Sequence, residues 1–545
     1  MRKSMNLFQS GLKVSLAAIM SFSILAGCSG GGSDGPAEGE APEASSNFNP
    51  TGLPIVKEPI TLKMIAGKAP TTAPDWNTTM LWQEYEKMTN IKVEWEMVPN
   101  DTMTEKRNIL LAGGDYPHAF FTAGIPLADL QKYGQQGIFI KLNDLIDQHA
   151  PNLKALLEKY PDVKKGLTMP DGNIYSFPGV YDPEFKSVLS SAKMWVKQSW
   201  LDELGLKEPQ TTDDFYNMLK AFKEKDPNKN GQQDEIPYMG VGVDSLMNYL
   251  KGSWGLSNHG IRNANVDLQP GTEELRFIPT DPKYKEMLEY MNKLYKEKLI
   301  GEDVFTVQAN QYYAKGAEGV YGATITTSPY TLMNQVDYIG ATALKGPHGD
   351  QIWAAIGSPL ATPGAFVITD KNPNPIETVR WIDYLYGEEG SKLFFMGFEG
   401  KSYNVTADGQ FEYTDEITKN PSGLTFEQAL IKYVVWPGGG YPNVVQEKFF
   451  KGAESRPEAV ETTEKYDPYV PEEVWPAFSF TAEENEDMGT LGADINSYVT
   501  EMRAKFVSGS ASFDEWDNYV STINQMGLER YMEIYKNAYN RYKQD

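Results

Sequence analysis

Apolar and polar residues alternate in two short stretches near the start of the folded part of this chain. Residues 60–65 (ITLKMI) and 91–98 (IKVEWEMV) show the period of two that is typical of half-buried strands. Between them, residues 76–90 (WNTTMLWQEYEKMTN) place apolar side chains at helical spacing. A strand, a helix and a strand in this order predict a βαβ unit, and therefore an α/β fold.

Helical periodicity returns in several later segments. Residues 200–204 and 212–222 are amphipathic, and so are residues 284–300 (YKEMLEYMNKLYKEKLI). The chain ends with helical patterns over residues 494–506 and 516–542. We therefore expect sheets flanked by helices, followed by a helical C-terminal part.

Composition sets the size class and the charge. The chain has 545 residues, of which 41% are apolar, and this length is typical of two or three domains. The formal net charge is −24, and no cluster of four or more Lys and Arg occurs. We expect no nucleic-acid partner, because phosphate binding needs a concentrated basic surface.

Cys28 is the only cysteine, and it follows a stretch with the features of a secretory signal. Arg2, Lys3 and Lys13 are positive, residues 14–25 carry no charge, and small residues directly precede the cysteine. The apolar run is shorter than the ~20 residues that span a bilayer. The sequence LAGC resembles the lipobox of bacterial lipoproteins; the alternative is an ordinary signal in which the cysteine lies by chance.

The lipobox resemblance implies a lipid anchor. Residues 1–27 would be removed as a signal peptide, and acyl chains such as palmitate on Cys28 would hold the protein on the extracellular face of the cell membrane. Residues 28–52 are rich in Gly, Ser, Pro and Glu and are predicted to form a flexible acidic tether. Because the only cysteine would be lipidated, we expect no disulfide.

Residues 226–235 (DPNKNGQQDE) have the spacing of an EF-hand-type calcium loop. Alternate oxygen-bearing side chains point inward in such a loop, and a glycine at its sixth position permits the sharp turn. The expected ligands are Asp226, Asn228, Asn230, the Gln232 backbone carbonyl, Asp234 and Glu235. Pro237 replaces the usual bidentate glutamate, so Glu235 would supply the last carboxylate. We expect structural Ca²⁺ here; the alternative is a polar turn without metal.

Several segments together resemble a known family. They are GGDYPHAFF at 113–121, DGNIYSFP at 171–178 and WLDELGLKEPQTTDDFYNMLKAF at 200–222. This order resembles the extracellular solute-binding lipoproteins of bacterial ABC importers. More narrowly, it is similar to the carbohydrate-binding type (family 1), which includes alginate-oligosaccharide-binding proteins. The likeness extends from about residue 55 to the C-terminus.

The resemblance implies a two-lobed fold of the periplasmic-binding-protein type (type II). It assigns residues 53–178 and 341–363 to an N-terminal lobe, and residues 179–340 and 364–545 to a C-terminal lobe. The expected chain crossings, or hinges, lie near Pro178, Gly340 and Gly364. In that family an acidic pair occupies the place of Asp234 and Glu235.

The resemblance also implies a function. The protein would be a lipid-anchored monomer on a Gram-positive cell that captures an oligosaccharide between its lobes and delivers it to the permease of an ABC importer. Closure and affinity would be linked, because both lobes contact the ligand. The alternatives are a peptide-binding or sensory lipoprotein on the same scaffold. Whether the sugar is neutral or acidic depends on the charges in the cleft.

Aromatic residues are the candidate sugar contacts, because the apolar faces of sugar rings stack on aromatic planes. The chain holds 11 Trp and 31 Tyr, more than core packing usually takes. Aromatics in Gly- and Pro-rich, non-periodic segments are the best candidates, since helical ones are more often core. The ligand-binding candidates are Trp436, Trp254, Trp76, Tyr330, Tyr441, Trp353, Glu399 and Tyr403.

No motif in a credible context indicates an enzyme. The four histidines show no HExxH or metal spacing, and a Walker A sequence is absent. Matches to GxSxG and GxGxxG fall in residues 27–35, with no strand before or helix after them. We expect no catalytic activity; a glycosidase built from two of the many carboxylates stays the less favoured alternative.

Overall fold

A computed structural model describes residues 44–544 of the chain. The expected signal peptide, the lipidation site Cys28 and most of the expected tether lie outside the described residues. Residues 44–52, expected to be the end of the tether, pack against the folded part: Phe48 is buried and pairs with Val56 in an antiparallel bridge.

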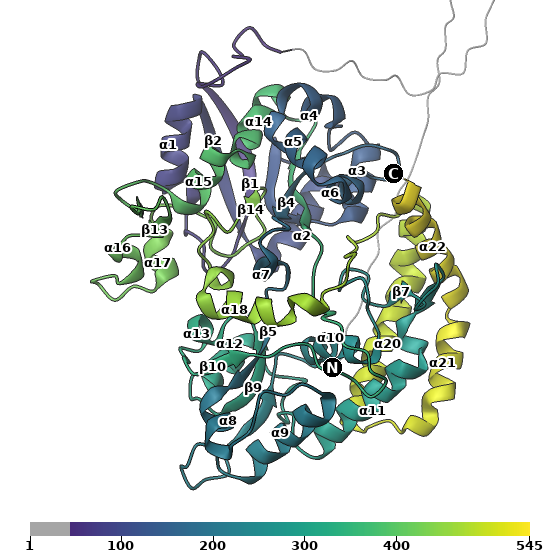
Figure 1. The fold of residues 1–545 in the computed structure, drawn as a ribbon. Helices are drawn as coiled ribbons and strands as arrows, with labels where there is room; N and C mark the ends of the chain where they lie inside the picture. The colour runs from purple at the N-terminus through teal and green to yellow at the C-terminus, as the bar shows by residue number, and fades with distance from the viewer. Residues whose placement is uncertain (1–43, 545) are drawn as a thin grey trace, which may run out of the picture. The chain divides into compact units, whose positions relative to one another are not determined.

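The first sheet has six strands in the order β14-β4-β11-β3-β1-β2 (Figure 1). Its strands are β1 (Ile60–Lys68), β2 (Ile91–Pro99), β3 (Ala119–Ile125), β4 (Phe177–Tyr181), β11 (Leu360–Ile368) and β14 (Val444–Val445). Strand β1 pairs in parallel with β2 and with β3, whereas β11 runs antiparallel to β3 and β4. The predicted βαβ opening is confirmed.

Helices cover both faces of this sheet because β1 is apolar on both sides. Leu62 and Met64 point into a first core that also holds Trp82 and Trp381, whereas Ile65 joins a separate cluster on the other face. The helices are α1 (Met80–Thr89), α2 (Asn100–Gly113), α3 (Leu127–Gln135), α4 (Asn143–His149), α5 (Pro151–Lys159), α6 (Pro161–Leu167), α14 (Pro375–Asp383) and α15 (Glu388–Met396). A small addition follows: β12 (Tyr403–Val405), β13 (Phe411–Tyr413), α16 (Asp415–Thr418) and α17 (Phe426–Leu430).

The second sheet has four strands in the order β10-β5-β9-β6. They are β5 (Lys193–Lys197), β6 (Ile236–Met239), β9 (Tyr321–Thr326) and β10 (Tyr338–Gly340). Around a second core lie α8 (Gln198–Leu204), α9 (Thr212–Glu224), α10 (Asp244–Lys251), α11 (Pro282–Lys296), α12 (Ala309–Gly316), α13 (Pro329–Leu332) and the hairpin β7 (Val266–Leu268) and β8 (Leu275–Phe277). Each sheet is thus flanked by helices, as the predicted fold class requires.

The C-terminal part is helical, as predicted. Its elements are α18 (Pro457–Tyr466), α19 (Ala482–Asp487), α20 (Ala493–Ser508), α21 (Trp516–Gln525) and α22 (Leu528–Gln544). Ile495, Val499 and Phe506 of α20 belong to the second core, and Asn292 of α11 donates to the Phe506 carbonyl at 2.8 Å. The C-terminal helices therefore extend the second lobe.

The chain crosses between the two cores three times. The crossings lie between Val188 and Met194, between Ile356 and Leu360, and between Phe450 and Tyr466, since the residues of each pair belong to different cores. The first crossing includes the short helix α7 (Lys186–Leu189), and the third includes α18. These positions differ from the crossings expected at residues 178, 340 and 364.

Close packing explains why those residues do not mark crossings. A Cβ on Gly364 would lie 2.3 Å from the Ile125 carbonyl oxygen, and one on Gly340 would lie 1.9 Å from Thr462 Oγ1. Both glycines permit close approach of a neighbouring element inside a sheet rather than bending. As a result, β11 continues through Gly364, and residues 364–450 pack with the first core. The family resemblance had instead assigned residues 364–545 to the C-terminal lobe.

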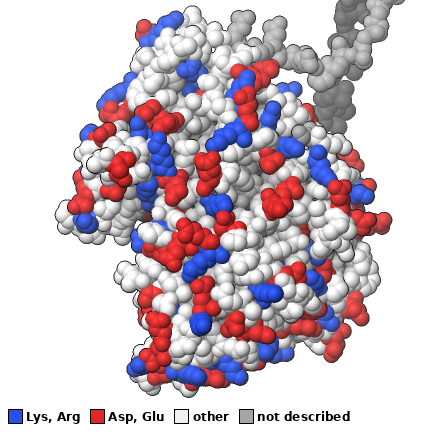
Figure 2. Space-filling view, in the orientation of Figure 1, with Lys and Arg blue, Asp and Glu red and all other residues white. Residues whose placement is uncertain are grey.

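The surface carries both signs of charge. Figure 2 shows acidic and basic side chains interspersed over one face, with no large basic area. Within residues 44–544, no helix is both long and apolar enough to cross a membrane.

Candidate ligand-binding site

A cavity of about 230 Å³ lies at the carboxyl ends of β1 and β3 in the first sheet. Open α/β sheets commonly bind ligands at this edge, where strands end and loops begin. Three of the predicted aromatic residues, Trp76, Trp436 and Tyr441, line the cavity, and each keeps only a small exposed area. The structure therefore brings together residues that lie 365 positions apart in sequence.

Hydrogen bonds fix the orientation of these indoles. Trp76 Nε1 donates to Thr72 Oγ1 at 3.1 Å, and the Thr72 hydroxyl donates to the Val435 carbonyl at 2.8 Å. Trp436 Nε1 donates to the Phe395 carbonyl at 2.9 Å. The two aromatic walls are thus joined through Thr72, and their polar atoms are already satisfied. Their remaining contact with a ligand would be apolar stacking.

The glycine run after Trp436 is needed for this close approach. Gly438 has φ +108°, and a Cβ there would lie 2.2 Å from the Ala69 Cβ. Only glycine adopts this conformation without strain and lets the loop pass beside the end of β1. The backbone therefore forms one wall of the cavity.

A second cavity, of about 320 Å³, lies in the second lobe and reaches the crossings. Its apolar lining includes Met194, Tyr249, Ile325 and Trp353. Trp353 stacks on Tyr466 with ring centroids 4.0 Å apart, and its Nε1 donates to Ser190 Oγ at 2.8 Å.

Tyr181 is a residue of the first sheet that lies at the second cavity. It ends β4 of the first sheet but lines the cavity of the second lobe, and its strand pairs with β14, which follows Tyr441 closely. Burial raises the pKa of Tyr181; the Glu454 carboxylate adds to this effect and the Arg262 guanidinium opposes it. Burial also raises the pKa of Tyr441 well above its usual value, with smaller contributions from Tyr181 and Glu454. Tyr181 and Glu454 therefore lie near enough to Tyr441, which lines the first cavity, to affect its pKa.

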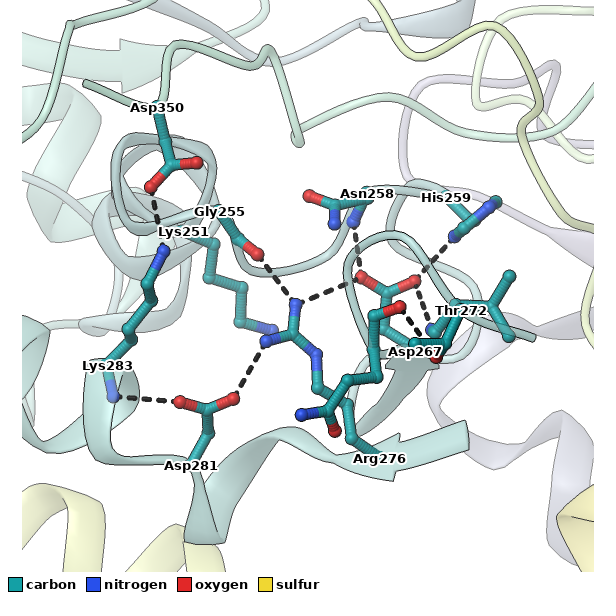
Figure 3. A network of polar contacts seen from close by, with 12 residues as sticks. Lys251, Gly255, Asn258, His259, Asp267, Thr272, Arg276, Asp281, Lys283 and Asp350 are labelled. Atoms are coloured by element: carbon teal, nitrogen blue, oxygen red, sulfur yellow. Dashed lines mark hydrogen bonds and ion pairs between the residues drawn. The ribbon is translucent and has the colours of Figure 1, made fainter. Parts of the chain in front are cut away.

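A buried polar network holds the loop that presents Arg262 (Figure 3). Asp267 accepts the backbone N–H of Asn258 at 2.6 Å and lies 2.5 Å from His259 Nδ1. Arg276 donates to the Gly255 carbonyl at 2.6 Å and to Asp281 at 2.8 Å.

The far side of this loop is packed just as firmly, because the His259 ring stacks on Trp475 at 3.9 Å. At the end of the loop, the Arg262 guanidinium donates to the Ala361 carbonyl of β11 at 3.0 Å, and so links the two lobes.

The other predicted ligand-binding residues lie outside both cavities. Trp254 is 3% exposed in the second core and packs on Tyr290. Tyr330 donates to the Tyr338 carbonyl at 2.6 Å. Glu399 is exposed, and Tyr403 is buried in β12 of the small addition. For these four, ligand contact stays a prediction that the geometry does not favour.

Sequence reasoning missed Tyr181, Arg262 and Glu454. A usable signal existed only for Tyr181, which ends a short strand just before Asp182 and Pro183. Arg262 lies in a turn, Glu454 lies in a short 3-10 helix on the third crossing, and the places of both beside the second cavity depend on tertiary contacts. No local pattern could have indicated them.

The predicted calcium loop folds around its own side chains. Asp226 accepts the backbone N–H groups of Asn230 at 3.2 Å and Gly231 at 3.0 Å, and Gly231 has φ +74°. The side-chain amides of Asn228 and Asn230 donate to Asp234 at 3.1 and 3.0 Å. The two Asp side chains of the loop therefore accept hydrogen bonds from N–H groups of the loop itself.

The charges of this loop are only partly compensated. The amide donors of Asn230 and Asn228 lower the pKa of Asp234, whereas burial raises the pKa of Glu235. One Glu235 oxygen is buried without a hydrogen-bond partner among the described residues. In residues 44–544 no three His, Cys, Asp or Glu side chains form a metal-binding group by themselves, so a cation here would need the amide and backbone oxygens as well.

A larger cavity of about 780 Å³ lies elsewhere, among α4, α5, α6 and α22. Its lining mixes apolar residues with Lys164, Lys165 and Arg541, and none of the predicted ligand-binding residues reaches it. Its size alone does not make it the ligand site: Phe478 and Tyr542 line it, but it lacks the tryptophan walls of the other two cavities.

Within residues 44–544, two lobes joined by three crossings, with an aromatic-lined cavity in each lobe, define a binding protein that can enclose a ligand. The chain belongs to the family of bacterial extracellular solute-binding proteins, to which residues 81–423 match.

Similar proteins extend over nearly the whole chain. The fructooligosaccharide ABC transporter substrate-binding protein FusA of Streptococcus pneumoniae is 28% identical over 499 residues, which cover 90% of this chain and 91% of FusA. The structure of FusA in complex with kestose matches with a TM-score of 0.75 and 27% identity, and covers 89% of this chain and 99% of that one. An EF-hand mutant of FusA bound to fructo-nystose matches similarly, with a TM-score of 0.74, 27% identity and the same coverage.

A structure of the alginate-binding protein AlgQ2 without calcium ion also matches. Its TM-score is 0.71 and its identity 25%, and the match covers 89% of this chain and 99% of AlgQ2. These likenesses agree with the family and fold predicted from the sequence.

Proposed function

We propose that the protein captures an oligosaccharide between its two lobes and delivers it to an ABC importer. The observation that carries this proposal is the pair of aromatic cavities, one walled by Trp76 and Trp436 of the first lobe and the other by Trp353, with Tyr181 of the first sheet in its lining. A chain of sugar rings presents both apolar faces and hydroxyls, so it suits a site in which aromatic walls stand beside polar side chains. The similarity to FusA and AlgQ2, both named as binders of oligosaccharides or alginate, supports this proposal.

The three crossings give this proposal a mechanism. A ligand that contacts both lobes favours the closed arrangement by its additional contacts. Arg262 and Tyr181 each reach from one lobe to the other, so closure would bring them onto the ligand. The closed complex would be the form that an importer permease receives.

A thermal-shift screen of the full chain against oligosaccharides and peptides tests the proposal. At ligand concentrations near 100 times the dissociation constant, binding adds about 2.7 kcal/mol to the free energy of unfolding. We expect oligosaccharides to raise the midpoint and peptides not to. A shift with peptides alone would favour the peptide-binding alternative, and release of shorter sugars would indicate a glycosidase.

We also propose that structural Ca²⁺ occupies the loop of residues 226–235. All its donors are oxygens, which a hard cation requires, and the unpartnered Glu235 oxygen points to a missing positive group. The relatives support this proposal: one FusA structure is of an EF-hand mutant, and the AlgQ2 structure is described as without calcium ion. The loop follows α9, away from both cavities, so the ion would stabilise the second lobe rather than touch the sugar.

Anchoring by a lipid on Cys28 is a further part of the proposed function. The extracellular family supports export, and the lipobox-like sequence supports acylation. A Cys28→Ser variant should lose the acyl mass increment and be released from the cells. Unchanged membrane attachment of that variant would refute the anchor.

A further inference from the structure

The first cavity has a lining without charge. Its lining residues are Gly67, Ala69, Thr72, Trp76, Asn100, Met103, Thr104, Phe121, Thr122, Ala123, Gly124, Phe394, Val435, Trp436, Pro437, Gly438, Gly439, Gly440 and Tyr441. None of these side chains carries a charge that could form an ion pair with a ligand. A ligand carboxylate held here would lose its hydration without gaining a cation, which is strongly unfavourable.

The second cavity has one charged lining residue, Arg262. Its guanidinium already donates to the Ala361 carbonyl at 3.0 Å, on the strand of the other lobe. Arg262 therefore serves first as a link between the lobes, although its remaining N–H groups can still donate to a ligand.

A carboxylate lies beside the second cavity. Glu454 lies on the third crossing and is half-buried, and Ser191, which lines the second cavity, donates to Glu454 Oε1 at 2.6 Å. The Ser187 hydroxyl of α7 donates to the Glu454 backbone carbonyl at 2.7 Å and fixes this segment. Among residues 44–544, no Lys or Arg forms an ion pair with Glu454. Its negative charge is therefore not offset by an ion pair beside the second cavity.

The negative charge of Glu454 affects the pKa values of neighbouring side chains from both lobes. Burial is the main cause that raises the pKa of Tyr181, and the Glu454 carboxylate is the second. Glu454 also helps to raise the pKa of Tyr441, which lines the first cavity. It also partly offsets the burial that lowers the pKa of Lys193 to about 8. Lys193 itself donates to the carbonyls of Ser187 and Ser190, so it is held by the backbone and is not the ion partner of Glu454.

We infer that this protein selects neutral oligosaccharides over those built from uronic acids, and that Glu454 is the specificity-determining residue. The inference rests on the proposed function and names the substrate class of that site. Sugar hydroxyls can donate to the Glu454 carboxylate, and hydrogen bonds to a charged acceptor are about twice as strong as neutral ones. A sugar carboxylate offers no donor at neutral pH and meets a like charge instead, and like charges brought together cost several kcal/mol at an interface.

The test compares sugars that differ only in charge. Isothermal titration of the full chain would use kestose, galactotriose, trigalacturonate and the methyl ester of trigalacturonate. Kestose probes neutral fructosides, and the other three form a series in which esterification or reduction removes the carboxylate charge. We expect a neutral trisaccharide to bind at least about 100-fold more tightly than trigalacturonate, since two unfavourable effects add.

Two variants assign the selectivity to Glu454. Glu454→Gln keeps the shape of the side chain but removes its charge. The affinity for neutral sugars should therefore fall about tenfold, as expected for the loss of a hydrogen bond to a charged group. The ratio of affinities for neutral trisaccharide and trigalacturonate should fall by a similar factor. Glu458→Gln is the matched control, because it removes one charge four residues later, where the carboxylate pairs with Arg456 instead. That control should keep the wild-type selectivity.

The possible outcomes separate the inference from the function. Tighter binding of trigalacturonate than of its ester by the wild-type chain would overturn the inference and leave the proposed function intact. Equal selectivity in Glu454→Gln and the wild type would remove Glu454 as the determinant. If no oligosaccharide of either kind binds, the proposed function fails, and the inference fails with it. The wild-type series decides the substrate class even if Glu454→Gln does not fold.

Discussion

Asp383 shows how one buried carboxylate can serve a structural purpose in the first lobe. It is 1% exposed and caps α5, accepting the backbone N–H groups of Leu153 at 2.8 Å and of Asn152 at 3.2 Å. These N–H groups belong to the first turn of the helix and have no partner within it. Burial nonetheless raises the pKa of Asp383 to about 6, because its hydrogen bonds compensate only part of the lost hydration.

This raised pKa predicts a pH dependence. Between about pH 4 and pH 6 the folded protein holds a proton that the unfolded chain has released, so the contribution of Asp383 to the free energy of unfolding falls as pH rises. The total change is roughly 3 kcal/mol, from about 1.4 kcal/mol per pKa unit. Urea unfolding at pH 4, 5, 6 and 7 should show a wild-type minus Asp383→Asn difference that declines over this window. A difference that is constant with pH would contradict the assignment.

Two tryptophans with similar sequence contexts should respond differently to substitution. Trp436 and Trp254 both lie beside glycines, but only Trp436 lines a cavity. Replacing either by Ala should cost about 3–5 kcal/mol of stability, as for other large buried side chains. Only Trp436→Ala should also weaken oligosaccharide binding. Calorimetric titration below the unfolding midpoints of both variants measures this, and equal loss of affinity would refute the proposed wall.

The glycines explain why sequence alone could not separate these two residues. A Cβ on Gly252 would lie 1.8 Å from the Ile352 carbonyl oxygen, so the glycine beside Trp254 permits packing inside a core. Gly438, beside Trp436, permits the approach of a loop to a sheet edge. A glycine next to an aromatic residue is typical of both situations. Only the tertiary contacts decide between them.

At the scale of elements, local patterns predicted the regular structure well. The strands from residues 60 and 91 and the helix between them follow directly from periodicity, and so do α9, α11 and the C-terminal helices. The Thr211 capping box that begins α9 is also readable in sequence, and its two hydrogen bonds are present. Short elements such as β14, with two residues, carry no such pattern. Their position depends on pairing with β4.

The loop after α9 should make the stability of the second lobe depend on calcium. If Ca²⁺ is present at about 100 times its dissociation constant, its removal should lower the free energy of unfolding by about 2.7 kcal/mol. The unfolding midpoint should then fall by roughly 3–8 °C. Differential scanning calorimetry with and without EGTA measures this. Asp226→Asn should lower the midpoint in calcium and abolish the EGTA effect, because Asp226 would donate both charge and an oxygen ligand.

A neighbouring acid provides the control for the calcium experiment. Asp213 lies in the first turn of α9, outside the loop, so Asp213→Asn changes the same charge without touching the expected ligands. That variant should keep the full EGTA effect. An unchanged midpoint after chelation of wild-type protein would contradict the calcium proposal.

At the scale of the whole molecule, the fold class could be predicted but the division of the chain could not. Each lobe is built from discontinuous segments, and residues 364–450 return to the first core through β11 and α14. The order of strands in a sheet and the path of a crossing depend on contacts between distant residues. The ligand site shares this property, since Tyr181, Arg262 and Glu454 come from three separate segments.

A crystal structure of the full chain with an oligosaccharide bound tests the central claim most directly. We predict one ligand in contact with both lobes, with rings against Trp436 and Trp76 in the first cavity and hydroxyls at Tyr181, Arg262 and Glu454. A ligand confined to one lobe, or bound in the 780 Å³ cavity beside α22, would contradict it.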